Sequence, residues 1–401
     1  TGTTGTEPSA TGTTGTEPSA TGTTGTEPAA TASTENGISN IGTESVTITD
    51  TTVSDASTLV TLNSKTTGVI TASLVTAVTG TASELNKLLT AGNDITQFSE
   101  NSFSSLTTAT VSDSTLSVAD LNGAINATTS TVFSLSAGAT INTGDQVAFT
   151  TLLGYENAGQ VAISDQNITV EGDLDTATAN LLNDTTTGTV TATIASSEVS
   201  HLKLLRGTNA YTITIASGDA EVSASDLNAV NALTTEAVDL TNVTALAASS
   251  ISDLGILATA ITNNEFSNDT GLTTIAVNET TIDATTLAST IDAYDTINGS
   301  NTTEMTLASG VTINVDASEV TEILTDQSAG RLTISDQLIT VTGAITVSAA
   351  NDLNGITQGT VTASIATDST VDSLATLTGT NAYTITIASG DATGSTAAEL
   401  T

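Results

Sequence analysis

Thr81-Ala-Ser-Glu84-Leu-Asn-Lys-Leu-Leu89 belongs to a series of similar stretches that recur along this chain. The Thr81 hydroxyl can accept from the backbone N–H of Glu84, and the Glu84 carboxylate can reach back to the N–H of Thr81, which is a helix capping box. The leucines that follow are spaced three and four residues apart, so they form one apolar stripe. The stretch therefore predicts a short, capped helix of two to three turns.

The same pattern recurs closely at three other places and more loosely at six. In the close copies a capping residue precedes two short residues, an acid and then aliphatics, and the acid in the first turn suits the helix dipole. The close copies span 117–125, 223–230 and 316–324, and the looser ones start near Asp55, Ser196, Ser250, Asp283, Ala349 and Ser369. The sequence therefore predicts a row of short helices.

Thr/Val/Ile-rich segments lie between these helices and alternate hydroxyl with aliphatic residues, which is typical of strands with one buried face. They span 69–74, 190–194, 211–215, 305–308, 311–315 and 338–341. One strand plus one helix, repeated along a body without proline, is typical of a solenoid. We expect an α/β fold, an elongated solenoid of short parallel strands alternating with short capped helices; an all-β parallel β-helix remains the alternative.

Longer repeats divide the chain. TNAYTITIASGDA occurs at Thr208–Ala220 and again at Thr380–Ala392, an offset of 172, while ISDQNITVEG (163–172) matches ISDQLITVTG (334–343) and GTVTATIA (188–195) matches GTVTASIA (359–366), both at 171. We expect a first solenoid section at 37–161, a complete unit at 162–332 and a truncated second copy at 333–401. The decapeptide repeats that open the chain predict a spacer over 1–36. Because 395–401 begins another capped helix, we expect the parent protein to continue.

The composition excludes several classes of function. Five Lys+Arg stand against 43 Asp+Glu, a formal net charge of −38, so no basic face exists for nucleic acid or for an anionic membrane. The chain has no cysteine and no apolar run long enough for membrane insertion. Because no basic segment is followed by an apolar stretch, we expect no signal peptide within this stretch of sequence. With 38% hydrophobic residues it is also unlike disordered acidic chains.

Catalysis has little support in this sequence. His201 is the single histidine, and we interpret it as an ordinary helix residue rather than a general base or a metal ligand. Motifs such as GxSxG, GxGxxG and GxxxxGK[ST] are absent, and there is no Trp. We therefore predict that the chain is not an enzyme and has no catalytic or cofactor-binding residues.

Calcium is the one ligand kept open. Asp165 and Asp336 lie in the two ISDQ blocks, and Asp219 and Asp391 lie in the two SGDA blocks. Aspartate oxygens at repeated positions would suit a calcium site, but aspartate and glycine are equally typical of turns. Neither the EF-hand loop nor the calcium-binding nonapeptide is present. We expect the chain to bind no cofactor, with these four aspartates as the candidate ligands if calcium is bound.

The stretches TTGTVTA (186–192), ASDLNAV (224–230) and ASELNKLL (82–89) resemble the giant, repetitive, acidic cell-surface proteins of marine picocyanobacteria, the type linked to swimming motility. The similarity covers most of 37–401. It implies an extracellular or cell-surface location and a structural role, with no catalytic residues to transfer. The TGTTGTEPSA array has no counterpart in that resemblance, which leaves open another kind of surface filament or adhesin.

Together these observations predict a structural, extracellular repeat protein that forms a rod-like stalk, surface-layer or filament element. One alternative is an adhesin that binds a cell-surface or glycan partner through a solenoid face, with calcium as a potential stabiliser. Another is a self-assembling filament subunit whose partners are further copies of the same repeat.

Overall fold

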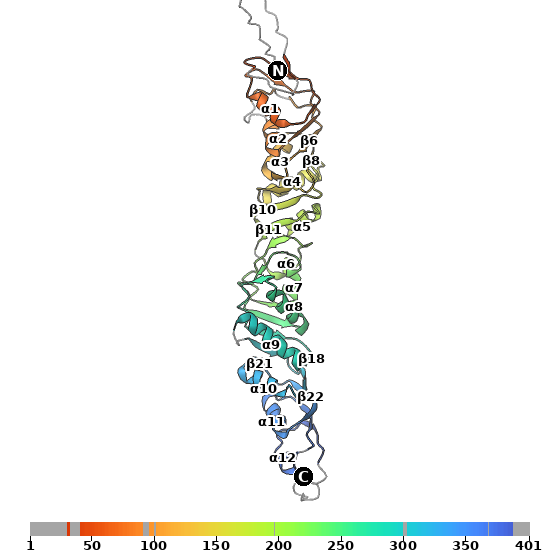
Figure 1. Ribbon diagram of the computed structural model, residues 1–401, viewed down its shortest axis with the longest axis vertical. Helices are drawn as coiled ribbons and strands as arrows, with labels where there is room; N and C mark the ends of the chain where they lie inside the picture. Colours follow the sequence, from red (N-terminus) through yellow and green to blue (C-terminus); the bar gives the residue numbers. More distant parts are fainter. Residues whose placement is uncertain are drawn as a thin grey trace, which may run out of the picture.

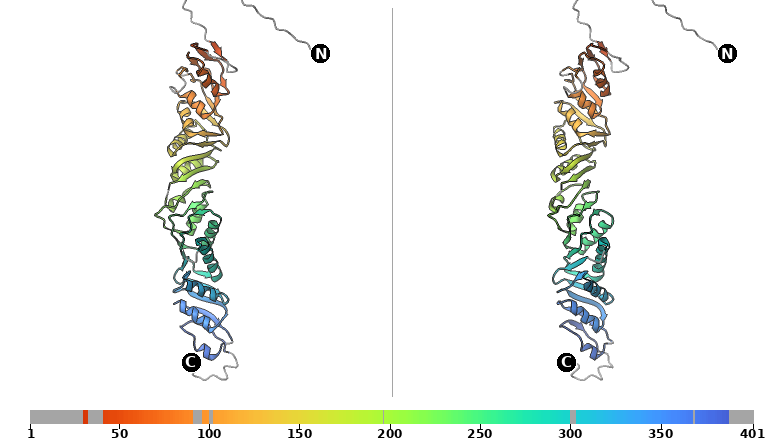
Figure 2. Two further views of the ribbon diagram at one scale, coloured as in Figure 1. Left: turned by 60° about the vertical axis from the view of Figure 1, so that its left-hand side comes forward. Right: turned by 90° about the vertical axis from the view of Figure 1, so that its left-hand side faces the viewer.

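The computed structural model describes residues 30–32, 41–90, 96–99, 102–195, 197–299, 303–367 and 369–387 (Figure 1). It is a mixed α/β protein in which helices and parallel strands alternate along the chain. The elements follow one another along the long axis of the picture, from α1 near one end to α12 near the other (Figures 1 and 2). The predicted spacer lies outside the described residues except for 30–32.

Twelve helices occur in the described part of the chain, which overturns the all-β alternative. Their capping residues and apolar stripes explain why the chain does not remain extended there. They are α1 (Ala56–Asn63), α2 (Ala82–Leu89), α3 (Val118–Asn126), α4 (Gln146–Asn157), α5 (Thr176–Thr185), α6 (Val199–Leu202), α7 (Ala224–Asn231), α8 (Ile251–Thr262), α9 (Ala284–Asn298), α10 (Val320–Ala329), α11 (Val347–Ile356) and α12 (Val371–Leu374).

The strands form several sheets in which every ladder is parallel, as expected when a crossover separates successive strands. The strands of the first half are β1 (Ala30–Ala32), β2 (Val46–Ile48), β3 (Thr52–Val53), β4 (Ile70–Thr71), β5 (Ala77–Gly80), β6 (Thr108–Val111), β7 (Thr115–Ser117), β8 (Val132–Leu135), β9 (Thr140–Asn142), β10 (Asn167–Leu174), β11 (Val190–Ile194) and β12 (Ala210–Thr212). Their orders are β1-β2-β4, β3-β5-β6-β8 and β12-β11-β10-β9-β7.

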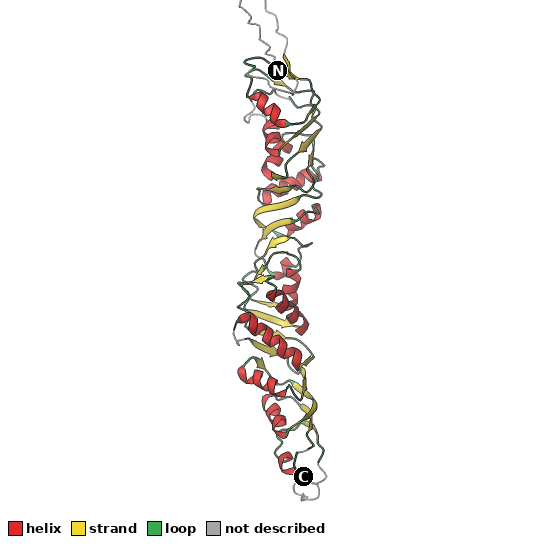
Figure 3. Cartoon of the chain, in the orientation of Figure 1, coloured by secondary structure: helices red, strands yellow, loops and turns green. Residues whose placement is uncertain are grey.

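The second half is also built from parallel strands that alternate with helices. Its strands are β13 (Glu221–Ser223), β14 (Val238–Asp239), β15 (Ala245–Ser249), β16 (Phe266–Ser267), β17 (Thr274–Val277), β18 (Thr281–Asp283), β19 (Glu304–Leu307), β20 (Thr312–Asp316), β21 (Leu332–Thr333), β22 (Leu338–Ile345), β23 (Val361–Ile365) and β24 (Ala382–Thr384). Their orders are β13-β15-β17-β19-β21, β14-β16 and β18-β20-β22-β23-β24. Helices lie beside these strands along the described part of the chain, to the left of the picture at α1 to α3 and at α10 and α11, and to the right at α7 and α8 (Figures 1 and 3).

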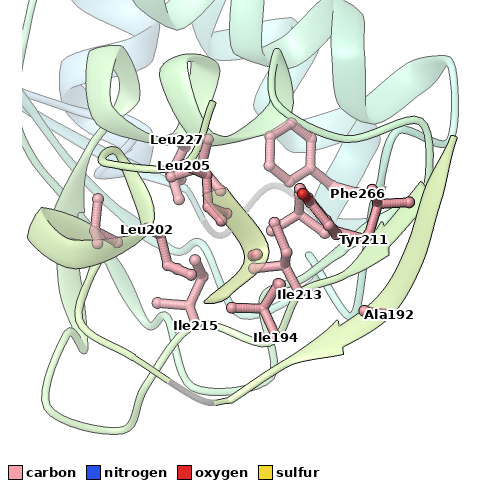
Figure 4. Close-up of a cluster of buried hydrophobic side chains, with 14 of the residues drawn as sticks. Ala192, Ile194, Leu202, Leu205, Tyr211, Ile213, Ile215, Leu227 and Phe266 are labelled. Carbon is pink, nitrogen blue, oxygen red and sulfur yellow. The ribbon is translucent and has the colours of Figure 1, made fainter. Parts of the chain in front are cut away.

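The core lies between strands and helices and is mainly aliphatic. In β11, Val190, Ala192 and Ile194 are buried while the threonines between them are exposed, which is the predicted two-residue alternation. A close-up of one part of the core shows Ile213 and Tyr211 among aliphatic side chains from neighbouring elements (Figure 4). The core thus runs through successive strand–helix segments, by which we mean a helix with the strands beside it.

The predicted capping box is complete at α2. Thr81 Oγ1 accepts from Glu84 N (3.2 Å), and Glu84 Oε2 accepts from Thr81 N (2.9 Å). At α3, α7 and α8 the capping serine accepts from the third helical N–H. Helix starts are therefore largely set by local sequence.

One close copy of the pattern was placed wrongly. The helix expected from Asp316 begins at Val320, and its capping residue Glu319 makes no capping side-chain bond. Asp316 still belongs to β20, where it pairs with Thr342, and Ala317 N donates to Thr342 O (2.9 Å). The strand ladder therefore delays the helix, although Glu319 does reach back to the N–H of Asp316 (3.0 Å).

Other expectations were incomplete. α4 and α5 were not predicted, although Asp145 and Asp175 cap them; the third position after each cap is Ala148 or Thr178 and not the acid of the close copies. α8 and α9, of 12 and 15 residues, are longer than the predicted two to three turns. The strand expected over 69–74 shrinks to β4. Ser196 lies outside the described residues.

Elements separated by 171 or 172 residues correspond closely. β10 and β22 have the same length and the same register shift against the next strand, and β11 and β23 have the same burial pattern. α5 corresponds to α11 in the same way, and α6 to α12. The chain therefore contains two copies of the same local structure, in which some equivalent positions carry different residues.

Candidate functional site

The most regular feature of the molecule is a buried turn that joins neighbouring strand–helix segments. The buried Thr186 Oγ1 donates to Gln166 O (2.6 Å) and accepts from Gly188 N (2.9 Å). Thr357 repeats both bonds, with Gln337 O (2.6 Å) and Gly359 N (2.9 Å). Each hydroxyl thus satisfies a backbone group of its own turn and one of the preceding segment, and a buried backbone group without a partner would be costly.

Glycine follows in this turn because two backbones meet there. A Cβ on Gly188 would lie 2.3 Å from Gln166 O, and one on Gly359 would lie 2.2 Å from Gln337 O. A third copy, at Gly68, would place a Cβ 2.1 Å from Glu44 O. The recurring Thr-x-Gly motif, which is Thr-Thr-Gly at 66–68 and 186–188 and Thr-Gln-Gly at 357–359, is therefore a close-contact turn between segments. Sequence periodicity alone did not show this contact.

Asparagines connect the helices in the same manner. Asn180 of α5 donates from Nδ2 to Leu204 O (2.8 Å) and accepts at Oδ1 from Arg206 N (2.8 Å). Asn351 of α11 makes the equivalent bonds to Thr376 O (2.9 Å) and from Thr378 N (2.8 Å). In both helices this asparagine therefore contacts the next segment rather than its own.

Several helix starts receive a capping bond from the following segment. Asp219 Oδ2 accepts from Val199 N (2.6 Å) at the start of α6, where no local side chain caps the helix. Asp113 does the same for Ala82 of α2 (2.6 Å) and Glu279 for Ile251 of α8 (3.0 Å). These acids satisfy a first-turn N–H that would otherwise have no helical partner.

The predicted calcium residues occupy turns and helix caps. Asp165 Oδ2 accepts from Gly138 N (3.1 Å) and its Oδ1 from Gln166 Nε2 (2.6 Å). Asp336 accepts from Ser309 Oγ and, at 3.1 Å, from Gln337 Nε2. Asp219 is the cap just described, and Asp391 lies outside the described residues. The structure does not bring the three described aspartates together, because each bonds within or beside its own segment.

His201 and the equivalent tyrosines have clear positions. His201 is exposed on the four-residue helix α6. Tyr211 is fully buried, and its hydroxyl accepts from Asn209 Nδ2 (3.2 Å); burial raises the pKa of Tyr211 to about 12. Tyr383 is half-buried, and burial raises its pKa as well. Tyr211 thus packs between segments (Figure 4).

A charged cluster that sequence reasoning missed joins α9 to α10. Arg331 Nη1 bonds Asp292 Oδ1 (3.0 Å) and Asp295 Oδ2 (2.8 Å), and Nη2 bonds Asp326. Asp326 is buried, and burial raises its pKa although Arg331 opposes the shift. The hydrogen bond to Asp295, with those to the other two acids, raises the pKa of Arg331. The only signal in the sequence was the spacing of Asp292 and Asp295 on one helix face.

One groove of the described part of the chain lies on its helices. A groove of about 500 Å³ lies beside α7 and α8 and is lined by residues that include Asn231, Ile256 and Glu265, without an aromatic side chain. Within the described ranges, His, Asp and Glu do not gather in any group of three or more that could hold a metal ion. Over the same residues, none of the helices has the length and apolar character needed to cross a membrane.

No protein-family model matches this chain, and its sequence has no significant match among curated proteins.

Proposed function

We propose that this protein is a structural element of a cell surface, an elongated α/β solenoid whose coils stack into a stalk, surface layer or filament. Each coil would be one strand–helix segment, and every added repeat would lengthen the rod. The acidic exterior would keep the rod soluble. The location outside the cell rests on the resemblance of the repeat motifs described above.

One observation carries this proposal: neighbouring segments are joined by the same bonds in both copies of the long repeat. Thr186 and Thr357 bond the preceding segment identically, and Asn180 and Asn351 bond the following one identically. A junction that repeats unchanged lets units be added without new contacts. The side chains described above serve these junctions rather than a shared cleft.

Small-angle X-ray scattering of the full chain tests the proposal. A compact protein of 401 residues would have a radius of gyration of about 21 Å. A solenoid should give a much larger value and a pair-distance distribution with a long, linear tail. A radius close to the compact value would contradict the proposal.

An adhesin remains a second candidate because one observation favours it. Thr193 and Thr212 are paired on adjacent strands and exposed, and Ser364 and Thr384 repeat this arrangement. A regular, uncharged hydroxyl row of this kind suits hydrogen bonding to a glycan. Binding to polysaccharide that Thr193→Asp with Thr212→Asp abolishes would support the adhesin, and no binding by the unmodified chain would count against it.

A calcium-stabilised form of the adhesin is tested separately. Thermal melting would be compared in calcium and in a chelator, with the Asp165→Asn and Asp336→Asn variants as controls. A melting temperature that falls on chelation only in the unmodified chain would assign calcium to these turns. An unchanged melting curve would leave them as turns alone.

A further inference from the structure

The strongest unassigned feature is a surface patch formed by Leu181, His201, Lys203, Leu204 and Arg206, called here the 201–206 patch. The chain has five Lys+Arg and one His, and three of these six residues fall within six positions. Leu181 and Leu204 are 57% and 62% exposed. A patch that combines cations with large exposed aliphatics is unusual on a chain of net charge −38.

The members of the patch come from adjacent elements. Leu181 lies on α5, directly after Asn180, whose amide bonds the backbone of Leu204 and Arg206. His201 is in α6, and Lys203 is the residue that ends it. The asparagine junction therefore holds the helix with Leu181 against the turn that carries the other members.

The second copy of the repeat shows that the fold does not require these side chains. Leu181 corresponds to Asp352, and Leu204 corresponds to Thr376. The backbone there is held by the same two bonds from Asn351, and the core leucines on either side are kept. An exposed aliphatic residue that the equivalent position replaces with aspartate has no evident role in packing.

The three cations are also replaced in the second copy of the repeat. His201, Lys203 and Arg206 correspond to Ser373, Ala375 and Thr378 at an offset of 172, and this copy forms α12 at the same place as α6. In the first copy, Arg206 pairs with Asp184 (2.8 Å) and Lys203 pairs with Asp226. Both pairs are exposed, with side chains 36% to 64% accessible, so each cation can exchange its acid for one on a partner.

We propose that the 201–206 patch binds the acidic surface of a second copy of this chain. Charge complementarity supports this occupant, since the remaining surface of the protein is strongly acidic and the patch gathers half of its Lys, Arg and His residues. The leucines would supply apolar contact area and the cations charged contacts, the two components of protein interfaces. A patch that meets a different surface of its partner gives an open-ended contact, which suits a filament or a layer. The inference rests on the proposed structural function.

Sedimentation velocity of the full chain over a range of concentrations tests this contact at low and at high salt. The apolar variant carries Leu181→Asp and Leu204→Thr, and the charge variant carries His201→Ser, Lys203→Ala and Arg206→Thr. Both sets use the residues of the second copy, so the fold should tolerate them, and circular dichroism checks this. We expect self-association that high salt weakens and that each variant weakens at least tenfold.

The control is Val147→Thr, which changes an aliphatic residue that is 71% exposed on α4 and should leave association unchanged. A wild-type chain that stays monomeric over the whole range, or variants that associate as the wild type does, would overturn the inference. Binding to phosphatidylserine vesicles that only the charge variant loses would also overturn it, since the patch would then serve a membrane surface. Small-angle scattering by the same samples separates the self-association proposal from the proposed structural function. Rod-like monomers would overturn only the contact between copies, whereas compact particles would contradict the elongated solenoid on which that contact rests.

Discussion

Thr186→Val should open the junction between two neighbouring segments without removing packing volume. The change keeps the shape of the side chain and removes the hydroxyl that bonds Gln166 O at 2.6 Å and Gly188 N at 2.9 Å. Two backbone groups then lose their partner in a buried turn. At about 1–2 kcal/mol for each group, local stability should fall by about 2–4 kcal/mol.

Hydrogen exchange read by mass spectrometry suits this prediction better than global denaturation. Segments that bond mainly to their neighbours need not unfold together, so a single unfolding free energy would not be well defined. Amide exchange in peptides that cover 164–190 should accelerate by about 30- to 700-fold, at about 1.4 kcal/mol for each factor of ten. Peptides from α9 should exchange at the wild-type rate.

Two comparisons make the result specific. Thr187→Val removes an exposed hydroxyl that bonds Ser164 O (3.0 Å), and its effect should stay under about 1 kcal/mol. Thr357→Val should reproduce the Thr186→Val effect in the second copy, confined to the peptides around it. If Thr186→Val and Thr187→Val accelerated exchange equally, or if neither did, the hydroxyl would not hold the junction.

Three further changes address the turn, the charged cluster and the buried tyrosine. Gly188→Ala should destabilise its junction by more than about 2 kcal/mol, because the added Cβ would lie 2.3 Å from a backbone oxygen. Gly218→Ala is the control: its Cβ would meet nothing within 4 Å, so the change should be nearly neutral. Amide exchange rates of the two variants would show the difference. Arg331→Met leaves buried acids unpaired and should lower the stability of the region around α10 by about 3–5 kcal/mol. The loss should be smaller at acidic pH, where Asp326 is protonated. Thermal melting of Arg331→Met as a function of pH, with and without Asp326→Asn, would check this. The unfolded chain releases the tyrosine proton near pH 10, but burial raises the pKa of Tyr211 to about 12 in the folded chain, so stability should fall between these values. Tyr211→Phe should make that fall smaller, and Tyr294 and Tyr383, whose pKa values burial also raises, account for the rest.

Local sequence predicted the elements whose signals lie within one turn of helix or one strand. Thr81 and Glu84 form the expected capping box because both partners are three residues apart. The alternation in β11 was equally local, and its strand bounds were right. The start of α10 was wrong because Thr342, on another strand, holds the backbone around Asp316 extended, and no nearby residue signals that competition.

The candidate site was less accessible to sequence reasoning. Asp219 was singled out as a turn or calcium residue, whereas the structure places it as a cap for Val199, 20 residues earlier. Arg331 was counted only as a rare cation, although its partners Asp292 and Asp295 lie 39 and 36 residues away. These bonds join different segments, and a periodic sequence offers many equivalent acids between which spacing alone cannot choose.

The sequence by itself determined the α/β alternation, the short capped helices, the repeat offset of 171 to 172 residues and the lack of a basic or thiol chemistry. These properties follow from residue types and from spacings shorter than one turn, or from direct repetition. Only the tertiary structure decided what the threonines, glycines and asparagines of the repeat do. Their partners belong to the neighbouring segment, so the parallel register had to be known before Thr186 could be placed on Gln166 or Asn180 on Leu204.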